Sequence, residues 1–249
     1  MEAYKSFASV YDEFMDNIPY EEWGVYVHNL LEKNNVSKGN IVELGCGTGS
    51  MTQILDSYGY NMIGIDISKD MLEIANNKKK DTGKNITYLY QSMADFELEN
   101  KVDACVCVCD SSNYLIENGE LMACFRSVYN NLKDNGILIM DFKTEYFYKK
   151  ILGECTIAEN REDASFIWEN FYYNEDKINE YILTLFIKDA NGKFDKYEET
   201  HYQRAYSIKE IKENLKVSGL KLINIYEAFT NKKPNRHSQR VYLIAKKEK

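Results

Sequence analysis

Proline and cysteine are scarce in this chain, and long hydrophobic runs are absent. Only two of the 249 residues are proline, and no segment rich in Pro, Gly or Ser marks a linker, so a single domain is expected. The six cysteines include no CxxC pair and are too sparse for a disulfide scaffold. No run approaches the roughly 18 apolar residues of a membrane-spanning helix. These absences exclude a disulfide-rich fold and a membrane-spanning protein.

The beginning of the sequence also lacks the features of a targeting segment. Residues 1–6 are mostly polar or charged, with no apolar stretch, so no signal peptide is expected. We therefore expect a cytoplasmic protein with reduced thiols and no membrane partner. The three histidines, His28, His201 and His237, do not cluster with cysteines, so no metal site is expected.

Positive charge is in deficit, because 31 Lys and Arg against 39 Asp and Glu give a formal net charge of -8. Binding to nucleic acid by neutralising phosphates requires clustered Lys and Arg. The only basic clusters lie at residues 78–80 and 232–240, and a solvated helix face explains the first. No nucleic-acid partner is expected.

Short apolar runs alternate with helical periodicity from residue 40 onward. This alternation is typical of a parallel sheet covered by helices on both faces. The sequence therefore predicts an α/β, Rossmann-like, doubly wound and mostly parallel seven-stranded sheet. The strands are expected at 41–44, 61–65, 86–90, 102–109, 137–140, 222–228 and 241–245, and the helices between them at 50–58, 69–77, 120–132 and 207–217.

The alternation is interrupted after residue 141 by three longer runs with turn residues between them, at 166–173, 178–187 and 198–206. These runs predict an inserted antiparallel β subdomain. The first 35 residues are expected to be helical, with a break at Pro19. We expect one domain, with a helical lid at 1–35, a core at 36–142 and 207–249, and an inserted layer on the substrate side at 143–206.

A glycine loop, ELGCGTG at residues 43–49, follows the first expected strand. Glycines between a strand and a helix let backbone approach a ligand closely. The spacing is GxGxG, so it fails the GxGxxG fingerprint of dinucleotide-binding folds, and no GK[ST] follows to make a P-loop. A lone GxGxG would be a weak signal.

Two carboxylates near this loop indicate the ligand. Glu43 would repel a pyrophosphate at close range, whereas S-adenosylmethionine has no phosphate and carries a sulfonium and an ammonium group. Asp66 ends the next strand, where a carboxylate accepts hydrogen bonds from both ribose hydroxyls. Together, the loop and the two carboxylates predict S-adenosylmethionine as the cofactor.

The chain as a whole resembles the class I S-adenosylmethionine-dependent methyltransferases. Residues 45–49 are similar to the first motif of that class, 64–72 to the second, and 91–96 and 102–115 to the segments around its third and fourth strands. The resemblance implies that Asp66 binds the ribose and that Met71 packs near the adenine. Ser92 stands where members of the class commonly have an Asp that binds the adenine amine. The backbone at Met93 and Ala94 is therefore the alternative contact with the adenine. The expected cofactor-binding residues are Tyr11, Glu43, Gly45, Cys46, Gly47, Thr48, Gly49, Asp66, Ile67, Met71, Ser92, Met93, Ala94 and Asp110.

A closer resemblance is to bacterial small-molecule methyltransferases related to glycine/sarcosine and nucleotide-sugar N-methyltransferases. It rests on short segments at 7–12, 110–115, 199–206 and 238–242. It implies a small-molecule acceptor methylated on N or O. It also implies that Tyr11 belongs to an N-terminal segment that closes over the cofactor. The protein is expected to be a monomer or a homodimer.

The residues that meet the acceptor are expected beyond the carboxyl ends of the strands and on the inserted layer. The expected catalytic residues are Tyr11, Asn113 and His201. The expected substrate contacts are Asn113, Tyr114, Trp168, His201 and Arg204. Alternatives stay open: Asp110 and Asn113 as helix caps, Trp168 as sheet packing, His201 as a structural histidine, and Arg204 paired either with an acidic substrate or with Arg240.

Two other functions compete with methylation of a small molecule. The chain could be an RNA or protein methyltransferase, or a protein that binds S-adenosylmethionine without catalysis. The Asn-Pro-Pro-Tyr loop of adenine-N6 and glutamine-N5 enzymes is absent from residues 110–113, and neither proline precedes a cysteine as in cytosine-C5 enzymes. The acidic composition further disfavours RNA.

Overall fold

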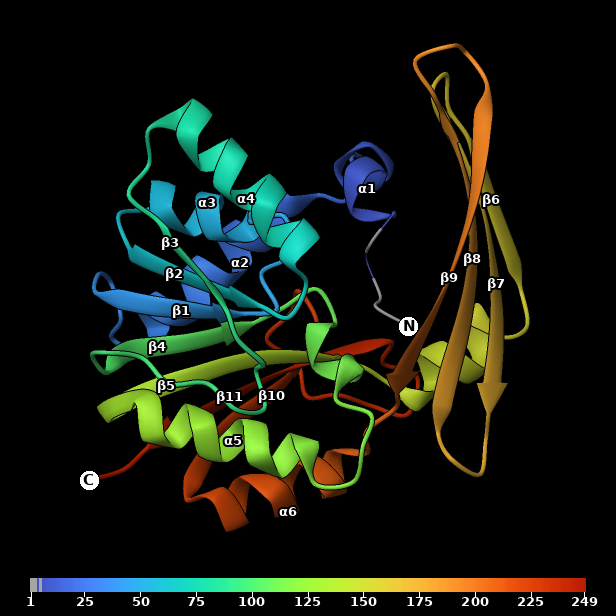
Figure 1. Cartoon of the computed structure of the whole chain (residues 1–249). Helices are drawn as coiled ribbons and strands as arrows, with labels where there is room; N and C mark the ends of the chain where they lie inside the picture. Colours follow the sequence, from blue (N-terminus) through green and yellow to red (C-terminus); the bar gives the residue numbers. More distant parts are fainter. Residues whose placement is uncertain (1–3, 5) are drawn as a thin grey trace.

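The fold consists of two separate sheets with helices packed around the larger one (Figure 1). The computed structural model describes Tyr4 and residues 6–249. The larger sheet has seven strands in the order β10-β11-β5-β4-β1-β2-β3. Its strands are β1 (Asn40–Leu44), β2 (Asn61–Asp66), β3 (Thr87–Tyr90), β4 (Val102–Cys107), β5 (Leu132–Lys143), β10 (Leu220–Glu227) and β11 (Arg240–Lys247).

The strands β1 to β5 pair in parallel, and β11 runs antiparallel between β5 and β10. Strand β1 lies between β2 and β4, so the connections leave in opposite directions on its two sides. Ligands of open α/β sheets bind at such a reversal, outside the carboxyl ends of the strands. The predicted Rossmann-like class and the mostly parallel seven-stranded sheet are confirmed.

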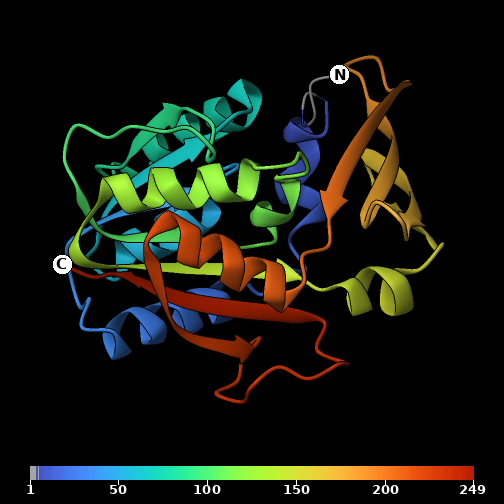
Figure 2. The same ribbon diagram turned by 90° about the horizontal axis from the view of Figure 1, so that it is seen from below.

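Helices cover both faces of this sheet. Figure 1 shows α2, α3 and α4 on one side and α5 and α6 on the other, and in Figure 2 the last two lie side by side. Each face is filled by an apolar cluster, with Val27 and Leu55 on the first side and Phe125 and Leu215 on the second. The helices are α2 (Tyr20–Lys33), α3 (Ser50–Ser57), α4 (Lys69–Thr82), α5 (Glu120–Asn131) and α6 (Ile208–Ser218).

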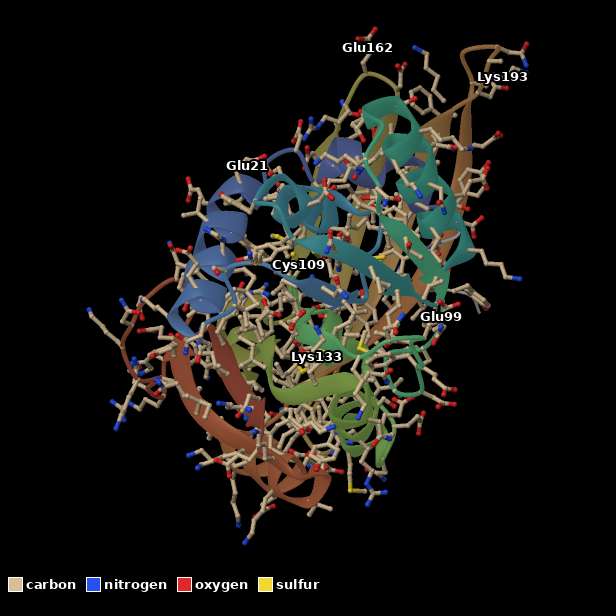
Figure 3. The ribbon with its side chains drawn as sticks, turned by 90° about the vertical axis from the view of Figure 1, so that its left-hand side faces the viewer. Glu21, Glu99, Cys109, Lys133, Glu162 and Lys193 are labelled. Carbon is tan, nitrogen blue, oxygen red and sulfur yellow. The ribbon has the colours of Figure 1, made fainter. Side chains whose placement is uncertain are left out.

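The smaller sheet is antiparallel, with four strands in the order β6-β7-β8-β9, and it is inserted between β5 and α6. Its strands are β6 (Thr156–Asn160), β7 (Ala164–Tyr173), β8 (Ile178–Lys188) and β9 (Phe194–Arg204). A short π-helix, η2 (Phe147–Leu152), leads into it. In Figure 3, Glu162 and Lys193 mark the turns at its outer end, while Cys109 lies in the middle of the view.

The first helix, α1 (Ala8–Phe14), lies between the two sheets (Figure 1). Phe7, Val10 and Phe14 pack against the inserted sheet in one cluster with Phe166 and Leu183. As expected, the N-terminal helices break at Pro19. Among the described residues, no helix is both long and apolar enough to cross a membrane.

Several element boundaries differ from the expected ones. Strand β4 ends at Cys107 rather than 109, because Cys109 and Asp110 have positive φ angles of 60° and 57° that turn the chain. Strand β5 begins at Leu132, where a helix was expected to end, because Leu132 pairs with Val102. Helix α4 continues to Thr82, where Gly83 ends it in a left-handed conformation. Neither β6 nor η2 was predicted.

Candidate active site

A cavity of about 800 Å³ opens at the carboxyl ends of β1, β2 and β4. Its wall is made by the glycine loop, the start of α4, the loop after β3, the turn after β4, and tyrosines from the N-terminal segment. The wall includes these predicted residues: Tyr11, Glu43, Gly45, Cys46, Gly47, Thr48, Asp66, Ile67, Met71, Ser92, Met93 and Tyr114. Their individual roles remain predictions.

The glycine loop follows the backbone shape that glycine permits. Gly45, Gly47 and Gly49 have φ angles of 69°, 52° and 78°, a region that side chains disfavour. A Cβ on Gly45 would lie 2.7 Å from the Cβ of Ser111, so the turns after β1 and β4 touch only because no side chain intervenes. Gly49 is packed under Tyr88, outside the cavity wall.

Asp66 holds the glycine loop in place. Its Oδ2 accepts a hydrogen bond from the Gly47 amide at 2.8 Å, and its Oδ1 accepts one from the Ser68 amide at 2.8 Å. Burial raises the pKa of Asp66, against the lowering effect of these backbone amides. The carboxylate is therefore fixed at the cavity wall, with lone pairs left for hydroxyl donors.

Glu43 is a buried carboxyl group on the cavity wall, only 3% exposed, and it accepts a hydrogen bond from the Thr52 hydroxyl. Burial raises its pKa to about 8, and the nearby Asp66 charge adds to that rise. Of the described residues, four with carboxyl groups line the cavity, Glu43, Asp66, Asp70 and Glu120, against one cationic residue, Lys69. This excess of negative charge fits a ligand with an ammonium and a sulfonium group.

Tyrosines close the side of the cavity that faces the inserted sheet. The hydroxyls of Tyr4 and Tyr114 lie 2.5 Å apart, and the ring of Tyr4 is 6.1 Å from that of Tyr11. Burial raises the pKa of each of these three tyrosines above its ordinary value, so their hydroxyls keep their protons at neutral pH. We call Tyr4, Tyr11 and Tyr114 the tyrosine roof.

Comparisons with known proteins agree with this geometry. The family model described as "Methyltransferase domain" matches residues 41–136. "Putative methyltransferase YqeM" from Bacillus subtilis (strain 168) is 33% identical over 247 residues, which is 99% of this chain and 98% of that protein. This chain belongs to the S-adenosylmethionine-dependent methyltransferases. Its cofactor is S-adenosylmethionine, for which the acidic lining of the cavity is suited.

Two solved structures are similar to this methyltransferase over nearly its full length. One is an S-adenosylmethionine-dependent methyltransferase from Clostridium acetobutylicum ATCC 824, with a TM-score of 0.86, 26% identity and complete coverage of both chains. The other is the sugar N-methyltransferase KedS8 from Streptoalloteichus sp ATCC 53650, with a TM-score of 0.77 and 15% identity over 96% of this chain and 93% of that one. The second similarity shows the fold alone.

Binding of the cofactor product should release a proton through Glu43. The pKa of about 8 leaves this carboxyl mostly protonated at pH 7, and an ammonium group beside it favours ionisation. Affinity for S-adenosylhomocysteine should therefore rise as the pH goes from 6 to 8. Calorimetry at pH 7 in buffers of different ionisation enthalpy measures the proton directly. In Glu43→Gln the buffer dependence should be absent; an unchanged dependence would exclude Glu43 as its source.

Asn113, which was expected to contact the acceptor, is not among the residues that line the cavity. Its side chain is fully buried and its amide is used within the protein. Nδ2 donates to the carbonyls of Lys143 (3.1 Å) and Arg204 (2.8 Å), and Oδ1 accepts from the Lys143 amide at 2.9 Å. Asn113 thus ties the end of β5 to the end of β9 in this methyltransferase.

Asp110 also lies outside the cavity wall, contrary to its expected contact with the cofactor. Its carboxylate pairs with Arg240 at 2.7 Å and Lys143 at 3.0 Å, and accepts a hydrogen bond from Gln203 at 2.9 Å. Burial alone would raise the pKa of Asp110, but Lys143 and Arg240 outweigh it and hold the pKa below its ordinary value. Arg240 pairs in addition with the fully buried Asp141.

Arg204 does not reach the cavity either. It pairs with Glu210 at 2.9 Å and lies over the ring of Tyr206 at 5.1 Å. The two arginines left open by the sequence therefore pair with the protein's own carboxylates and not with each other. The Ala94 amide donates to Ser92 Oγ at 3.2 Å, and Ser92 and Met93 line the cavity whereas Ala94 does not.

His201 and Trp168 lie behind the tyrosine roof. The His201 ring is 4.7 Å from the Tyr4 ring, and its Nε2 is 3.3 Å from Glu199 Oε2. Trp168 packs edge-on against Phe7 and Tyr181. Neither lines the cavity, so packing and structural roles account for their positions in this structure.

Tyr4 and Tyr20 line the cavity, although neither was predicted from the sequence. The two tyrosines have no distinguishing signal among the 20 in the chain. Ser111 lay within the recognised segment after β4, and its Oγ donates to the Gly45 carbonyl at 3.1 Å. Among the residues that the structure describes, no three metal-ligating side chains are grouped.

Proposed function

We propose that this methyltransferase acts on a small molecule and that the acceptor atom is a neutral amine nitrogen. The observation that carries the proposal is the tyrosine roof across the cavity. Tyr4 and Tyr114 are joined hydroxyl to hydroxyl, and the inserted sheet lies directly behind them. An acceptor must therefore fit under a closed aromatic wall, which suits a small molecule. We propose that the whole chain acts as one such methyltransferase domain.

The chemistry of the roof favours nitrogen over oxygen. An alcohol needs a base that removes its proton as it attacks the methyl carbon, whereas a neutral amine carries a free lone pair. The roof tyrosines keep their protons because their pKa values are raised. Burial likewise raises the pKa of the Cys109 thiol, which also lines the cavity. His201 is covered by Tyr4, so it is not placed as a base in this closed form.

The electrostatics favour an acceptor without an anionic group. Among the described lining residues the one cation is Lys69, which lies over the ring of Tyr90, 4.9 Å from its centroid. Phosphate or carboxylate groups are normally bound by Arg or Lys. The similarity to a sugar N-methyltransferase supports an amine acceptor only as an analogy of fold.

Transfer of labelled methyl groups from S-adenosylmethionine tests this function. The panel contains amino sugars and small amino acids, matched sugars with hydroxyl in place of amine, bulk RNA and a protein extract. We expect label on an amine and none on its hydroxyl counterpart. Label on RNA or protein alone would overturn the small-molecule proposal, and label on the hydroxyl counterpart would overturn the preference for nitrogen.

Tyr11→Phe should lower turnover more than cofactor binding. Tyr11 lines the cavity on the roof side, and its ring lies 5.3 Å from Phe7 and 6.1 Å from Tyr4, so the ring itself is part of the packed lid. Removing only the hydroxyl keeps that packing and removes the polar group of a side chain that lines the cavity. We expect turnover to fall about tenfold or more with little change in the affinity for S-adenosylhomocysteine. Equal turnover in both proteins would remove Tyr11 from the site. Tyr197→Phe, on the exposed edge strand β9, serves as the matched control.

A further inference from the structure

We infer that Glu199 is a positioning residue that fastens the N-terminal segment over the cofactor cavity and couples that segment to the inserted sheet. Glu199 lies on β9 of the inserted sheet and is only 7% exposed. Its position is far in sequence from the segment that it holds. The inference concerns the closure of the cofactor site and does not depend on which acceptor is methylated.

A single carboxylate collects three backbone hydrogen bonds from the segment before α1. Oε1 accepts from the amides of Ser6 at 2.6 Å and Phe7 at 3.0 Å, and Oε2 accepts from the Tyr4 amide at 2.9 Å. Helix α1 has no side-chain cap of its own, so these bonds satisfy donors that the helix start leaves free. The segment is thus held by a group outside its own helix.

The charge state of Glu199 matches this task. Burial alone would raise its pKa, but His201 and the amides of Phe7 and Ser6 outweigh burial and hold the pKa below its ordinary value. His201 Nε2 lies 3.3 Å from Oε2, on the same face of β9 two residues further along. A buried carboxylate that lost its three amides would need water in their place, so closing the segment satisfies Glu199 as well.

The fastened segment carries part of the tyrosine roof. Tyr4 lines the cavity, and its ring packs against His201 while its hydroxyl meets Tyr114. The Tyr4 carbonyl accepts a hydrogen bond from Ser68 Oγ at 3.5 Å, two residues after Asp66. One residue therefore touches both the inserted sheet and the loop that follows the ribose-binding strand.

The other end of α1 is attached to the cofactor loop. Asp12 accepts hydrogen bonds from Thr48 Oγ1 at 2.7 Å and from Lys78 Nζ at 2.8 Å. The lid is thus held at its start by the inserted sheet and further along by the glycine loop and α4. Because Glu199 provides the hydrogen bonds from the inserted sheet to this segment, beside the apolar packing of Phe7, it links closure over the cofactor to the position of the layer behind the roof.

Hydrogen exchange and binding kinetics on the full chain test the role of Glu199. In Glu199→Ala, the amides of Ser6 and Phe7 should lose protection, and S-adenosylhomocysteine should dissociate about tenfold faster at an unchanged association rate. Glu199→Gln should be intermediate, because its carbonyl oxygen still accepts from Ser6 and Phe7 while its NH₂ group faces the Tyr4 amide. Glu198→Ala, an exposed neighbour on the same strand, should behave as the unaltered protein.

Exchange in α6 separates this role from a loss of folding. A positioning residue leaves protection in Ile208–Ser218 unchanged while the N-terminal peptide opens. Wild-type dissociation and wild-type protection at Ser6 and Phe7 in Glu199→Ala would overturn the inference. If that variant unfolds throughout, the same two readings on Glu199→Gln decide, and wild-type values there overturn it equally.

Discussion

Replacing Arg240 by alanine is expected to lower the free energy of unfolding by about 3–5 kcal/mol. Arg240 lies between two carboxylates, Asp110 at 2.7 Å and Asp141, which is fully buried. Burial already raises the pKa of Asp141, and without the guanidinium this buried carboxyl has no cation beside it, while Asp110 is left with Lys143 as its only cationic partner among the described residues. Such uncompensated charge costs more than the pair itself contributes. Urea unfolding followed by circular dichroism measures the difference.

The exposed Arg236 on the preceding loop supplies the matched control. Arg236→Ala removes the same charge and should change stability by no more than about 0.5 kcal/mol. Arg240→Lys should fall between the two, because one ammonium group cannot bond both carboxylates as the planar guanidinium does. If Arg240→Ala lowered the free energy of unfolding by no more than Arg236→Ala does, Asp141 would not be ionised in the folded protein.

Asp66→Ala is expected to weaken binding of S-adenosylhomocysteine by about 1–3 kcal/mol, the size of lost hydrogen bonds to a charged acceptor. Two effects combine. The variant loses the carboxylate oxygens that would accept from the ribose hydroxyls, and it frees the Gly47 and Ser68 amides, each held at 2.8 Å. The glycine loop, which must approach the cofactor, therefore loses a hydrogen bond that holds it in place. Calorimetry measures the affinity.

Asp81→Ala, at an exposed position on α4, is the control for loss of one negative charge, and it should bind as the unaltered protein does. Asp66→Asn separates the two effects, because its one side-chain oxygen can still accept a hydrogen bond from a single backbone amide. Its affinity should lie between those of the alanine variant and the unaltered protein. Unchanged affinity in Asp66→Ala would refute the ribose role.

The cofactor cavity could be predicted from sequence because its parts are local. Gly45 and Gly47 have positive φ angles that the GxGxG pattern encodes directly, and Asp66 follows its strand at the same edge of a parallel sheet. Glu43 precedes the loop by two residues and lies on the cavity wall as its position in the pattern implied. The positions of these four residues follow from local geometry, which the sequence pattern encodes.

The acceptor side was predicted less well because its partners are distant in sequence. Asp110 was expected to face the cofactor, yet it is paired with Arg240, 130 residues away. Asn113 bonds the carbonyl of Arg204, 91 residues away. A side chain at a strand end can turn to the ligand or to such a partner, and only the folded structure decides between them.

The bounds of β5 and the existence of β6 also depend on pairing between residues that are distant in sequence. The apolar period located the buried half of β5, but the strand begins earlier because Leu132 pairs with Val102, while the polar residues 133–135 lie in the irregularity between that pair and Ile137–Ala104. Strand β6 carries no clear apolar alternation, and it forms because β7 offers a free edge along residues 165–169. Long-range pairing overrode local preference in both places.

A crystal structure with S-adenosylhomocysteine bound tests the central claim most directly. We expect the ribose hydroxyls within hydrogen-bond distance of Asp66, the amino group beside Glu43, and the sulfur facing the tyrosine roof of Tyr4, Tyr11 and Tyr114. Binding with the sulfur turned away from these tyrosines, or with the ribose away from Asp66, would contradict it.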